Sequence, residues 1–432
     1  MMATRTTTTR TTSTAPALSA DLFCACHADF LFEDLVQAYL DCRKSKRNSA
    51  SALAFEIDLE RNLTRLDTEL RDGTYRPGQS ICFVITKPKP REVWAADFRD
   101  RIVHHLMYNK ISPRFYARFI QDSCACIPGR GTMYGAVRLE AKIRSITQNW
   151  SKPAYYLKCD LANFFVSINK PILHKQLAAH IDEPWWLQLT EQILFHDPRQ
   201  DYQLRCHPKM LALVPPHKRL TSQPPEYGLP IGNLSSQFFA NVFLDALDQF
   251  VKHTLRAKHY IRYVDDFLIL HESAQQLNEW LEQINAFLPA RLGVQLNPKK
   301  TILQPVDRGV DFVGQVIKPW RRSTRRRTLR QAIHRVSTIP AAELYETTNS
   351  YYGQLRQASH SHNDRVRLTK AVFKRGKAVN SDLTKIYRGT NEHAYRSCSV
   401  PAHAGEQGLP VMRQRHFSTA SHSHGQSQLL LL

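Results

Sequence analysis

Two adjacent aspartates, Asp265 and Asp266, interrupt an apolar and β-branched stretch that runs from Tyr260 to Leu270. Such a run with a polar break in its middle is typical of two strands joined by a tight turn. Folding alone does not require the two carboxylates, because neighbouring like charges repel each other and lose hydration when buried. Aspartates are also frequent in ordinary turns, where they hydrogen-bond their own backbone. A divalent cation at the tip of the hairpin is the alternative that would explain the pair.

A third carboxylate, Asp160, ends a second predicted strand, 155–160. Alternation with a period of two places Tyr156, Lys158 and Asp160 on one face of that strand. A strand that ends in an acid, set beside a hairpin that carries two acids, can hold two Mg²⁺ ions roughly 3.5–4 Å apart for in-line phosphoryl chemistry. Oxygen-only ligands suit Mg²⁺. Asp160, Asp265 and Asp266 are therefore the candidate catalytic and metal-binding residues.

These segments resemble the reverse transcriptase family. Asp160 matches the first palm motif of that family, and Tyr263-Val264-Asp265-Asp266 matches the Tyr-X-Asp-Asp motif of the third. The resemblance covers residues 60–318 and includes several motifs in the right order. It implies an α+β chain with the right-hand polymerase fold, which has fingers, a palm with an antiparallel sheet and a helical thumb. It also implies an RNA-directed DNA polymerase that uses two Mg²⁺ ions, dNTPs, a template RNA and a primer that grows into cDNA.

The resemblance also assigns cations in the fingers to the nucleotide. The predicted strand 81–86 leads into Lys87-Pro88-Lys89-Pro90-Arg91, where the family carries a Lys/Arg pair before an Asp-Arg sequence. Lys87 and Arg91 are the candidate ligands of the triphosphate, with Lys89 as a third, because Lys and Arg offset the charge that develops there. The alternative is a basic strand end that is simply solvated.

Two further residues of the nucleotide site follow from the resemblance. Phe165 lies five residues after Asp160, where reverse transcriptases place an aromatic steric gate against the ribose 2′-hydroxyl. The alternative is a phenylalanine of the core, a role for which Phe164 is better suited. Lys300 matches the lysine loop beside the nucleotide and is preferred over Lys299.

The segment 228–237 resembles the second palm motif and points to a subfamily. Most reverse transcriptases have Gln-Gly here and end the motif in Ser-Pro, whereas this chain has Ile231-Gly232 and Ser236-Gln237. The latter pattern is that of the polymerases of diversity-generating retroelements. This resemblance implies error-prone copying into adenine-mutated cDNA with a small basic accessory protein as partner, and it places Gln237 at the nucleotide site.

The composition favours a polyanionic partner. The 432 residues include 59 Lys and Arg against 38 Asp and Glu, a formal net charge of +21. Nucleic acid is the usual partner of so basic a chain, although a ribosome-associated or membrane-surface protein would have the same balance. No run of about 18 apolar residues occurs, so no transmembrane helix and no membrane partner are expected. Nine cysteines with scattered spacing favour a reducing, cytoplasmic location over a disulfide framework.

The chain divides by composition and pattern into four parts. We expect a disordered tail over 1–19, fingers and palm over 20–318, a helical basic thumb over 319–390 and a loosely ordered tail over 391–432. Within the palm, 197–227 is rich in Pro and Lys and lacks periodicity. A loop of that length inside a domain is unusual and indicates an insertion, to which the sequence assigns no function.

The run 320–327 contains five arginines at the start of the predicted thumb. Such a run is usually a solvated face, but beside a primer-template cleft it is better interpreted as a phosphate contact. Nearby Tyr345, Tyr351 and Tyr352 either pack or stack on bases.

Two other functions fit the same residues. A group II intron-like or phage-defence reverse transcriptase would share the palm motifs. A maturase-like RNA-binding protein would use the fold as a scaffold without polymerising, but a pure scaffold gains nothing from three acids, so the polymerase is favoured.

Overall fold

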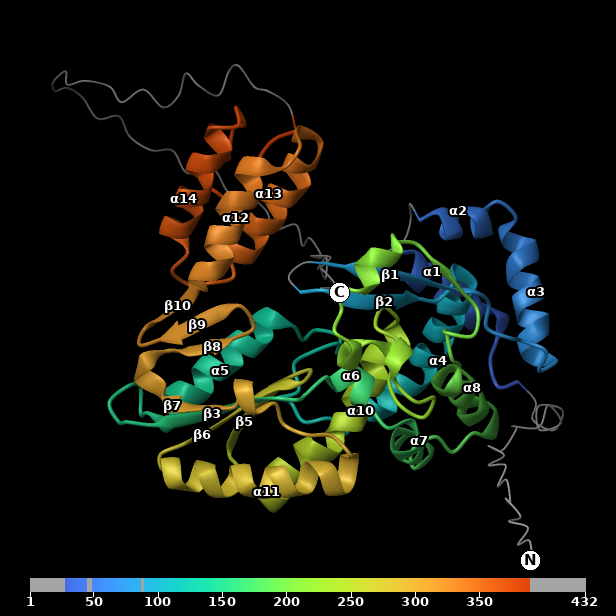
Figure 1. Ribbon diagram of the computed structural model, residues 1–432, viewed down its shortest axis with the longest axis horizontal. Helices are drawn as coiled ribbons and strands as arrows, with labels where there is room; N and C mark the ends of the chain where they lie inside the picture. The colour runs from blue at the N-terminus through green and yellow to red at the C-terminus, as the bar shows by residue number, and fades with distance from the viewer. Residues whose placement is uncertain (1–27, 45–48, 87–88, 389–432) are drawn as a thin grey trace, which may run out of the picture. The chain divides into compact units, whose positions relative to one another are not determined.

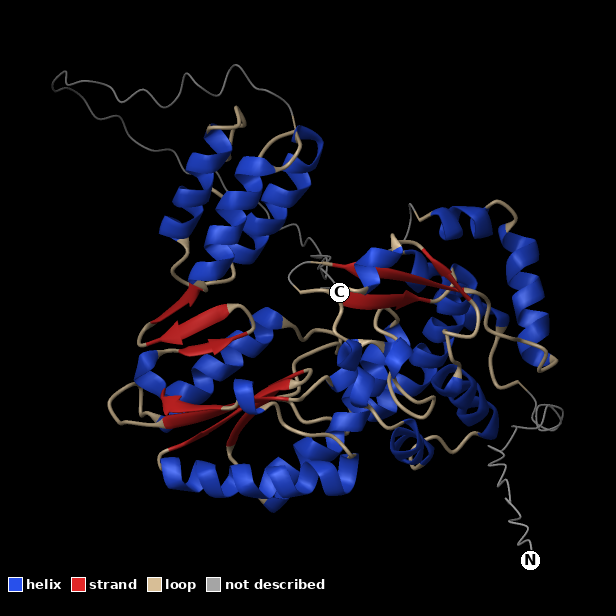
Figure 2. Ribbon diagram, viewed as in Figure 1, coloured by secondary structure: helices blue, strands red, loops and turns tan. Residues whose placement is uncertain are grey.

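The computed structural model describes residues 28–44, 49–86 and 89–388. Helices and strands form two compact units that interleave along the chain. The predicted α+β class is confirmed, because the described residues combine helices with sheets in which most strand pairs are antiparallel (Figure 2). The first unit comprises residues up to 127 together with 160–256 and 281–299, and the second comprises 128–159, 257–280 and the residues from 300 onward.

The first unit contains a three-stranded sheet in the order β2-β1-β4 (Figure 1). β1 (Ser80–Ile85) pairs antiparallel with β2 (Arg91–Ala95) and parallel with β4 (Tyr202–Leu204). Alternate residues of β1 are buried, as expected for a strand with one covered face. α4 begins after Asp97, whose side chain accepts a hydrogen bond from the backbone N–H of Arg99 at 3.0 Å. The N-terminal helices are α1 (Phe32–Arg43), α2 (Ala50–Glu56), α3 (Leu59–Arg71) and α4 (Phe98–Tyr116).

α10 (Leu234–Gln249) lies at the centre of the first unit and packs against α4 and α7. It is apolar on nearly all sides, and Phe238, Phe239 and Phe243 are fully buried, which is the pattern of a core helix. At its C-terminal end the helix continues into a π-helical turn. The neighbouring elements are α6 (Phe164–Ser167), α7 (Lys170–Ala178), α8 (Pro184–Phe195) and the π-helix η4 (Phe250–Thr254).

The segment 197–227 is more ordered than its sequence predicts. Besides β4 it contains a short helix and two 3₁₀ turns, each only three or four residues long. Elements this short leave no measurable periodicity, so the expectation of an irregular loop was wrong for a physical reason. They are α9 (Pro208–Leu211), η2 (Pro216–Lys218) and η3 (Leu220–Ser222).

The second unit contains a four-stranded sheet in the order β5-β6-β3-β7, with α5 packed against β5 and β6 (Figure 1). The predicted hairpin is present as β5 and β6, paired so that Tyr263 lies opposite Asp266. The elements are α5 (Thr132–Ile146), β3 (Tyr155–Asp160), β5 (His259–Tyr263), β6 (Asp266–His271) and β7 (Ile302–Pro305). Between β6 and β7 the chain forms α11 (Ala274–Leu292) and the 3₁₀ turn η5 (Pro298–Lys300).

A second sheet of this unit begins with a hairpin. Val313 and Gly314 have φ values of 42° and 89° and reverse the chain between its two strands. Arg321 and its neighbours, expected only as a charged run, form a third strand. The strands are β8 (Val310–Phe312), β9 (Gln315–Lys318) and β10 (Arg321–Thr324), with the 3₁₀ turn η6 (Val306–Arg308) before them.

The described C-terminal part is a bundle of three helices, as Figure 2 shows. Leu329, Val336 and Leu368 are among its fully or nearly fully buried residues. Tyr352 packs inside the bundle and its hydroxyl lies 2.6 Å from the hydroxyl of Thr369, so this tyrosine is not a stacking residue. The helices are α12 (Arg326–Thr338), α13 (Ala341–Leu355) and α14 (His362–Phe373), so the last described helix ends within the region 319–390 that was expected to be helical.

Candidate active site

The tip of the β5–β6 hairpin has an unusual backbone. Val264 and Asp265 form the turn, and Val264 has a φ of 55°. A β-branched residue rarely adopts this left-handed conformation, because its side chain crowds the backbone there. Strain of this kind costs on the order of 1–3 kcal/mol and is found most often at functional sites. The turn therefore positions Asp265 and Asp266 through a backbone conformation that a valine at position 264 disfavours.

A lysine that sequence reasoning did not single out pairs with the second aspartate. The Nζ atom of Lys158 lies 3.1 Å from Oδ2 of Asp266 and donates a hydrogen bond to the backbone oxygen of Asp311 at 2.9 Å. Its side chain is 16% exposed, so the ion pair is only partly screened by water. The alternation of 155–160 already placed Lys158 on the same face as Asp160, and this was the available signal. The ammonium offsets part of the charge that two adjacent carboxylates bring to the turn.

Asp160 is the last residue of β3 and is buried. β3 is the neighbour of β6 in the four-stranded sheet, and β6 begins at Asp266. The backbone oxygen of Asp160 accepts a hydrogen bond from the N–H of Asn297 at 2.8 Å. Within the part of the chain that the structure describes, no group of three His, Cys, Asp or Glu side chains is arranged to hold a metal ion. The carboxylates supply the right donor chemistry for Mg²⁺, so the metal site stays a prediction.

The two phenylalanines after Asp160 differ in burial. Phe164 is 3% exposed and packs against Phe243 of α10 with their ring centroids 6.4 Å apart. Phe165 is half-buried, and its backbone oxygen accepts a hydrogen bond from the N–H of Leu229 at 2.8 Å. Phe164 therefore has the core role that its sequence position suggested. The gate role of Phe165 remains a prediction that its partial exposure permits.

The segment that resembles the second palm motif contacts β2, a strand of the β2-β1-β4 sheet, which we propose is the fingers sheet. The backbone oxygen of Ile231 accepts a hydrogen bond from the N–H of Trp94 at 2.7 Å. Gly232 has a φ of 126°, and a Cβ atom there would lie 2.9 Å from the backbone oxygen of Trp94 and 2.9 Å from Cγ1 of Val93. Only glycine fits both the conformation and the close approach. Gly232 therefore permits the close packing of the motif on β2.

The remaining predicted residues of the nucleotide site are distributed over both units. Arg91 is exposed at the start of β2, and Gln237 is half-buried in the first turn of α10; both belong to the first unit. Lys300 is exposed in η5 and belongs to the second unit. Lys89 is exposed, and Lys87 lies outside the described residues.

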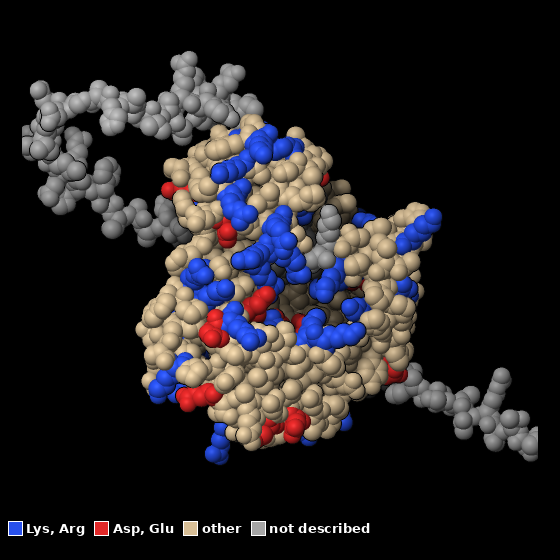
Figure 3. Space-filling model, turned by 60° about the vertical axis from the view of Figure 1, so that its left-hand side comes forward, with Lys and Arg blue, Asp and Glu red and all other residues tan. Residues whose placement is uncertain are grey.

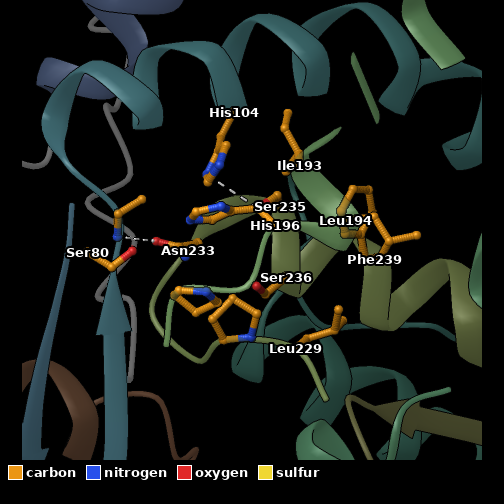
Figure 4. A pocket seen from close by; sticks show the side chains of 13 residues that line it. Ser80, His104, Ile193, Leu194, His196, Leu229, Asn233, Ser235, Ser236 and Phe239 are labelled. Carbon is orange, nitrogen blue, oxygen red and sulfur yellow. Dashed lines mark hydrogen bonds between the residues drawn. The ribbon is translucent and has the colours of Figure 1, made fainter. Parts of the chain in front are cut away.

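A small polar cavity lies at the start of α10 (Figure 4). Its volume is about 20 Å³, which is enough for one water molecule. The side-chain oxygen of Asn233 accepts a hydrogen bond from the N–H of Ala96 at 3.1 Å, and the hydroxyl of Ser235 lies 3.4 Å from Nδ1 of His104. Burial lowers the pKa of His104 to about 3, so its imidazole is neutral near pH 7. This cavity is too small for a nucleotide. The hydrogen bonds of Asn233 and Ser235 beside it hold the motif in place.

The arginine run separates into two kinds of residue. Arg325 pairs with Asp311, and Arg322 is buried, with Nε 2.8 Å from Oε2 of Glu140. Arg326 and Arg327 are exposed in the first turn of α12. Figure 3 shows a face of the molecule on which Lys and Arg side chains predominate over Asp and Glu. Residues 319–388 include sixteen Lys and Arg against four Asp and Glu, so this region attracts polyanions.

The reverse transcriptase (RNA-dependent DNA polymerase) family matches residues 85–317, which is more than half of the chain. The chain therefore belongs to this family. The predicted membership in the reverse transcriptase family is confirmed, and with it the right-hand polymerase fold. The narrower assignment to retroelement polymerases stays a prediction.

The solved structures that are similar to the chain include two telomerases. An apo telomerase from Candida tropicalis, truncated from its C-terminal domain, shares 13% identity with a TM-score of 0.41 over 56% of this chain and 53% of that chain. A telomerase from Candida albicans in complex with the TWJ fragment of telomeric RNA shares 11% identity with a TM-score of 0.41 over 74% of this chain and 60% of that chain. The chain thus covers less than two thirds of either telomerase, and no curated protein matches it. None of the helices among the described residues is long and apolar enough to cross a membrane.

Proposed function

We propose that this chain copies an RNA template into cDNA by adding dNTPs to a primer 3′-end. The observation that supports it most directly is the aspartate pair at a strained hairpin turn inside the region that matches the reverse transcriptase family. Family membership gives the reaction class, and the conformation of Val264 is the feature that a mere scaffold would not need. Primer extension on an RNA template tests this proposal. Binding of RNA without extension would favour the maturase-like alternative.

In this proposal Asp160, Asp265 and Asp266 hold two Mg²⁺ ions. The ions, when bound, activate the primer hydroxyl and neutralise the triphosphate and the leaving pyrophosphate. The carboxylates orient the ions. Lys158 limits the mutual repulsion of the carboxylates by its pairing with Asp266. The support for this assignment is the donor chemistry of the three side chains and the neighbouring positions of β3 and β6 in one sheet.

The other residues bind and select the nucleotide in this proposal. Lys87, Arg91 and Lys300 neutralise phosphate charge, and Lys89 is the further cation. Phe165 excludes the ribose 2′-hydroxyl by its bulk, and Gln237 lies beside the nucleotide. Arg91 and Lys300 are both exposed.

The finer proposal is that the chain is the error-prone polymerase of a diversity-generating retroelement. It rests on Ile231-Gly232 and Ser236-Gln237 in the second palm motif. A small basic accessory protein and a cytoplasmic location belong to the same proposal. A pair of nearly identical repeats that differ mainly at adenines in the neighbouring DNA would support this subfamily over a group II intron-like or phage-defence enzyme.

Replacing Ile231 with Gln should reduce misincorporation opposite template adenines more than opposite other bases. Ile231 presents only apolar, β-branched bulk, whereas glutamine can donate and accept hydrogen bonds to a well-formed base pair. One such hydrogen bond contributes about 0.5–1.5 kcal/mol, which corresponds to roughly a threefold to tenfold change in error frequency. Sequencing cDNA made by both chains on one RNA measures the effect. An unchanged error spectrum with full activity would leave Ile231 a packing residue.

Replacing Arg326 and Arg327 together with Ala should weaken RNA binding and reduce its salt dependence. Each phosphate contact that is lost lowers the slope of log affinity against log salt by about 0.7–0.9, because fewer counterions are released. Titrations at several salt concentrations measure this slope. Arg325→Ala is the matched control, since that arginine already pairs with Asp311 and should change the slope less. Equal slopes for the parent and the double variant would show that the two arginines are only solvated.

A further inference from the structure

We propose that the segment 197–227 is a strut that joins the fingers strand β2 to the turn carrying Phe165 and thereby sets the selectivity for deoxyribose. This inference rests on the proposed polymerase function. The contacts that support it lie within the first unit. The sequence assigned the segment no role.

One end of the strut is built into the fingers sheet. β4 adds a parallel strand to β1, and the backbone oxygen of Asp201 accepts a hydrogen bond from the N–H of Ser80 at 3.1 Å. Leu220 packs with Cys82 and Trp94 in a small apolar cluster next to the sheet. The segment is therefore part of the fingers core.

The side-chain carboxylate of Glu92 in β2 binds the segment 197–227 at the sheet. The side chain of Glu92 is buried, with only 3% of the residue exposed, and its carboxylate receives three hydrogen bonds. The N–H of Leu220 donates at 2.8 Å, the hydroxyl of Thr221 at 3.1 Å and the indole N–H of Trp94 at 3.3 Å. Two of the three donors come from the segment 197–227. A buried carboxylate requires such partners, because it would otherwise bear the full cost of desolvation.

The interior of the segment is braced by a second set of contacts. Arg199 pairs with Asp197 with an N–O distance of 2.6 Å and also donates hydrogen bonds to the backbone oxygens of Leu220 and Gln223 at 3.1 Å and 2.6 Å. The two side chains of the ion pair are 17% and 15% exposed. The start of the segment is thus tied to the stretch that contacts Glu92, so the strut is held together along its own length.

The last residues of the strut, and the two residues that follow it, contact the short helix α6 that carries Phe165 and the residues after that helix. The N–H of Gly228 donates to the oxygen of Ile168 at 2.9 Å, and the N–H of Leu229 donates to the oxygen of Phe165 at 2.8 Å. The N–H of Lys170 donates to the oxygen of Glu226 at 2.9 Å. Together these backbone bonds fix the position of the Phe165 turn relative to the segment.

Leu220 connects the two ends directly. Its N–H contacts Glu92, and its Cδ1 atom would lie only 2.6 Å from a Cβ atom placed on Gly228. Gly228 has a φ of 88°, which other residues rarely adopt. Leu220 therefore packs on the backbone of Gly228. The next residue, Leu229, donates the hydrogen bond to Phe165. A displacement of Leu220 away from Glu92 therefore shifts the backbone at Gly228 and, through Leu229, the position of Phe165.

The substitution Glu92→Gln tests this role. The amide of Gln can keep an acceptor oxygen toward Leu220 and Trp94 and can donate from its NH₂ group to the hydroxyl of Thr221, but the negative charge that strengthens all three bonds is lost. We expect the ratio of kcat/KM for a dNTP to that for the matching rNTP to fall roughly threefold to tenfold, the range expected when hydrogen bonds to a charged acceptor become neutral ones. Thr221→Ala, which removes a single donor, should give a smaller fall in the same direction.

Glu226→Gln is the matched control, because Glu226 is exposed and its backbone oxygen, which the substitution keeps, makes the bond to the turn. Its nucleotide selectivity should equal that of the parent. A Glu92→Gln chain that loses thermal stability but keeps the parental selectivity would show that the segment is only a stabilising element, and would overturn the inference.

Hydrogen exchange separates this inference from the proposed polymerase function. Glu92→Gln should speed amide exchange in residues 165–170, which are far from position 92 in sequence, whereas Glu226→Gln should not. Unchanged exchange there would overturn the strut even in an active enzyme. Faster exchange in a chain that makes no cDNA would support the strut and count against the polymerase.

Discussion

Asp265→Asn should reduce Mg²⁺-dependent cDNA synthesis by on the order of a thousandfold or more, which corresponds to a barrier increase of about 4 kcal/mol. The substitution keeps the size of the side chain but removes a negative charge that two divalent ions require. Asp160→Asn should have the same effect, because it neutralises the third carboxylate. RNA binding should survive both changes, since we propose that it depends on Arg326, Arg327 and the other cations of residues 319–388.

Stability provides the check that the variant is folded. Asp265→Asn relieves repulsion between adjacent carboxylates, so the midpoint of thermal unfolding should be unchanged or slightly higher. Asp266→Asn is a less clean test, because it also removes the partner of Lys158. Exposed Asp307, in η6 of the same unit, supplies the control variant Asp307→Asn, which should extend primers at the parental rate. Substantial extension by purified Asp265→Asn would contradict the assignment of a polymerase.

The aspartate hairpin could be predicted from sequence because it is local. Apolar residues flank two polar ones, and the resulting strands pair with each other across a two-residue turn. The left-handed conformation of Val264 was not predictable in this way. A β-branched residue disfavours it, and only the surrounding structure imposes it. The pattern therefore gives the position of the turn but not its strain.

Long-range pairings were the main features that the sequence could not reveal. Lys158 and Asp266 are more than a hundred residues apart, and nothing local indicates that they form an ion pair. Glu92 is similar, since its partners in 220–221 lie in a segment without periodicity. The arginine run shows the same limit, because its linear pattern does not separate Arg325, which pairs with Asp311, from its exposed neighbours. The net charge of a sequence indicates the class of partner, whereas the tertiary structure determines which charged side chains are exposed.

Acidification should destabilise the first unit strongly, because two of its histidines are held neutral. Burial is the main cause that lowers the pKa of His104 to about 3 and that of His105 to about 4, against an ordinary value of 6.5. His196, His105 and Arg101 add positive charge around His104, and Lys44 and Arg101 do so around His105, where Asp41 opposes them.

The direction of the effect follows from proton binding. Between the folded and unfolded pKa values the unfolded chain binds more protons, so stability rises with pH in this window. The stabilisation is complete above about pH 6.5 and is lost as the pH falls toward about 4. Each histidine contributes a slope of up to about 1.4 kcal/mol per pH unit, so the two together should remove several kcal/mol by about pH 4.5.

Urea denaturation at a series of pH values between about 7.5 and about 4.5 measures this loss. His104→Gln cannot take up the proton and can still bond to the hydroxyl of Ser235, so its free energy of unfolding should fall less steeply than that of the parent. His217→Gln is the control, because His217 is exposed in η2 and its removal should leave the slope unchanged. If the parent and His104→Gln lost stability at the same rate, the buried imidazole would not be the group whose protonation unfolds the chain. The free energy of unfolding of His104→Gln could instead depend less on pH than that of the parent and of His217→Gln. That result would identify the cavity beside α10 as an acid-sensitive point of the fold, since the imidazole of His104 holds Ser235 at the start of the helix.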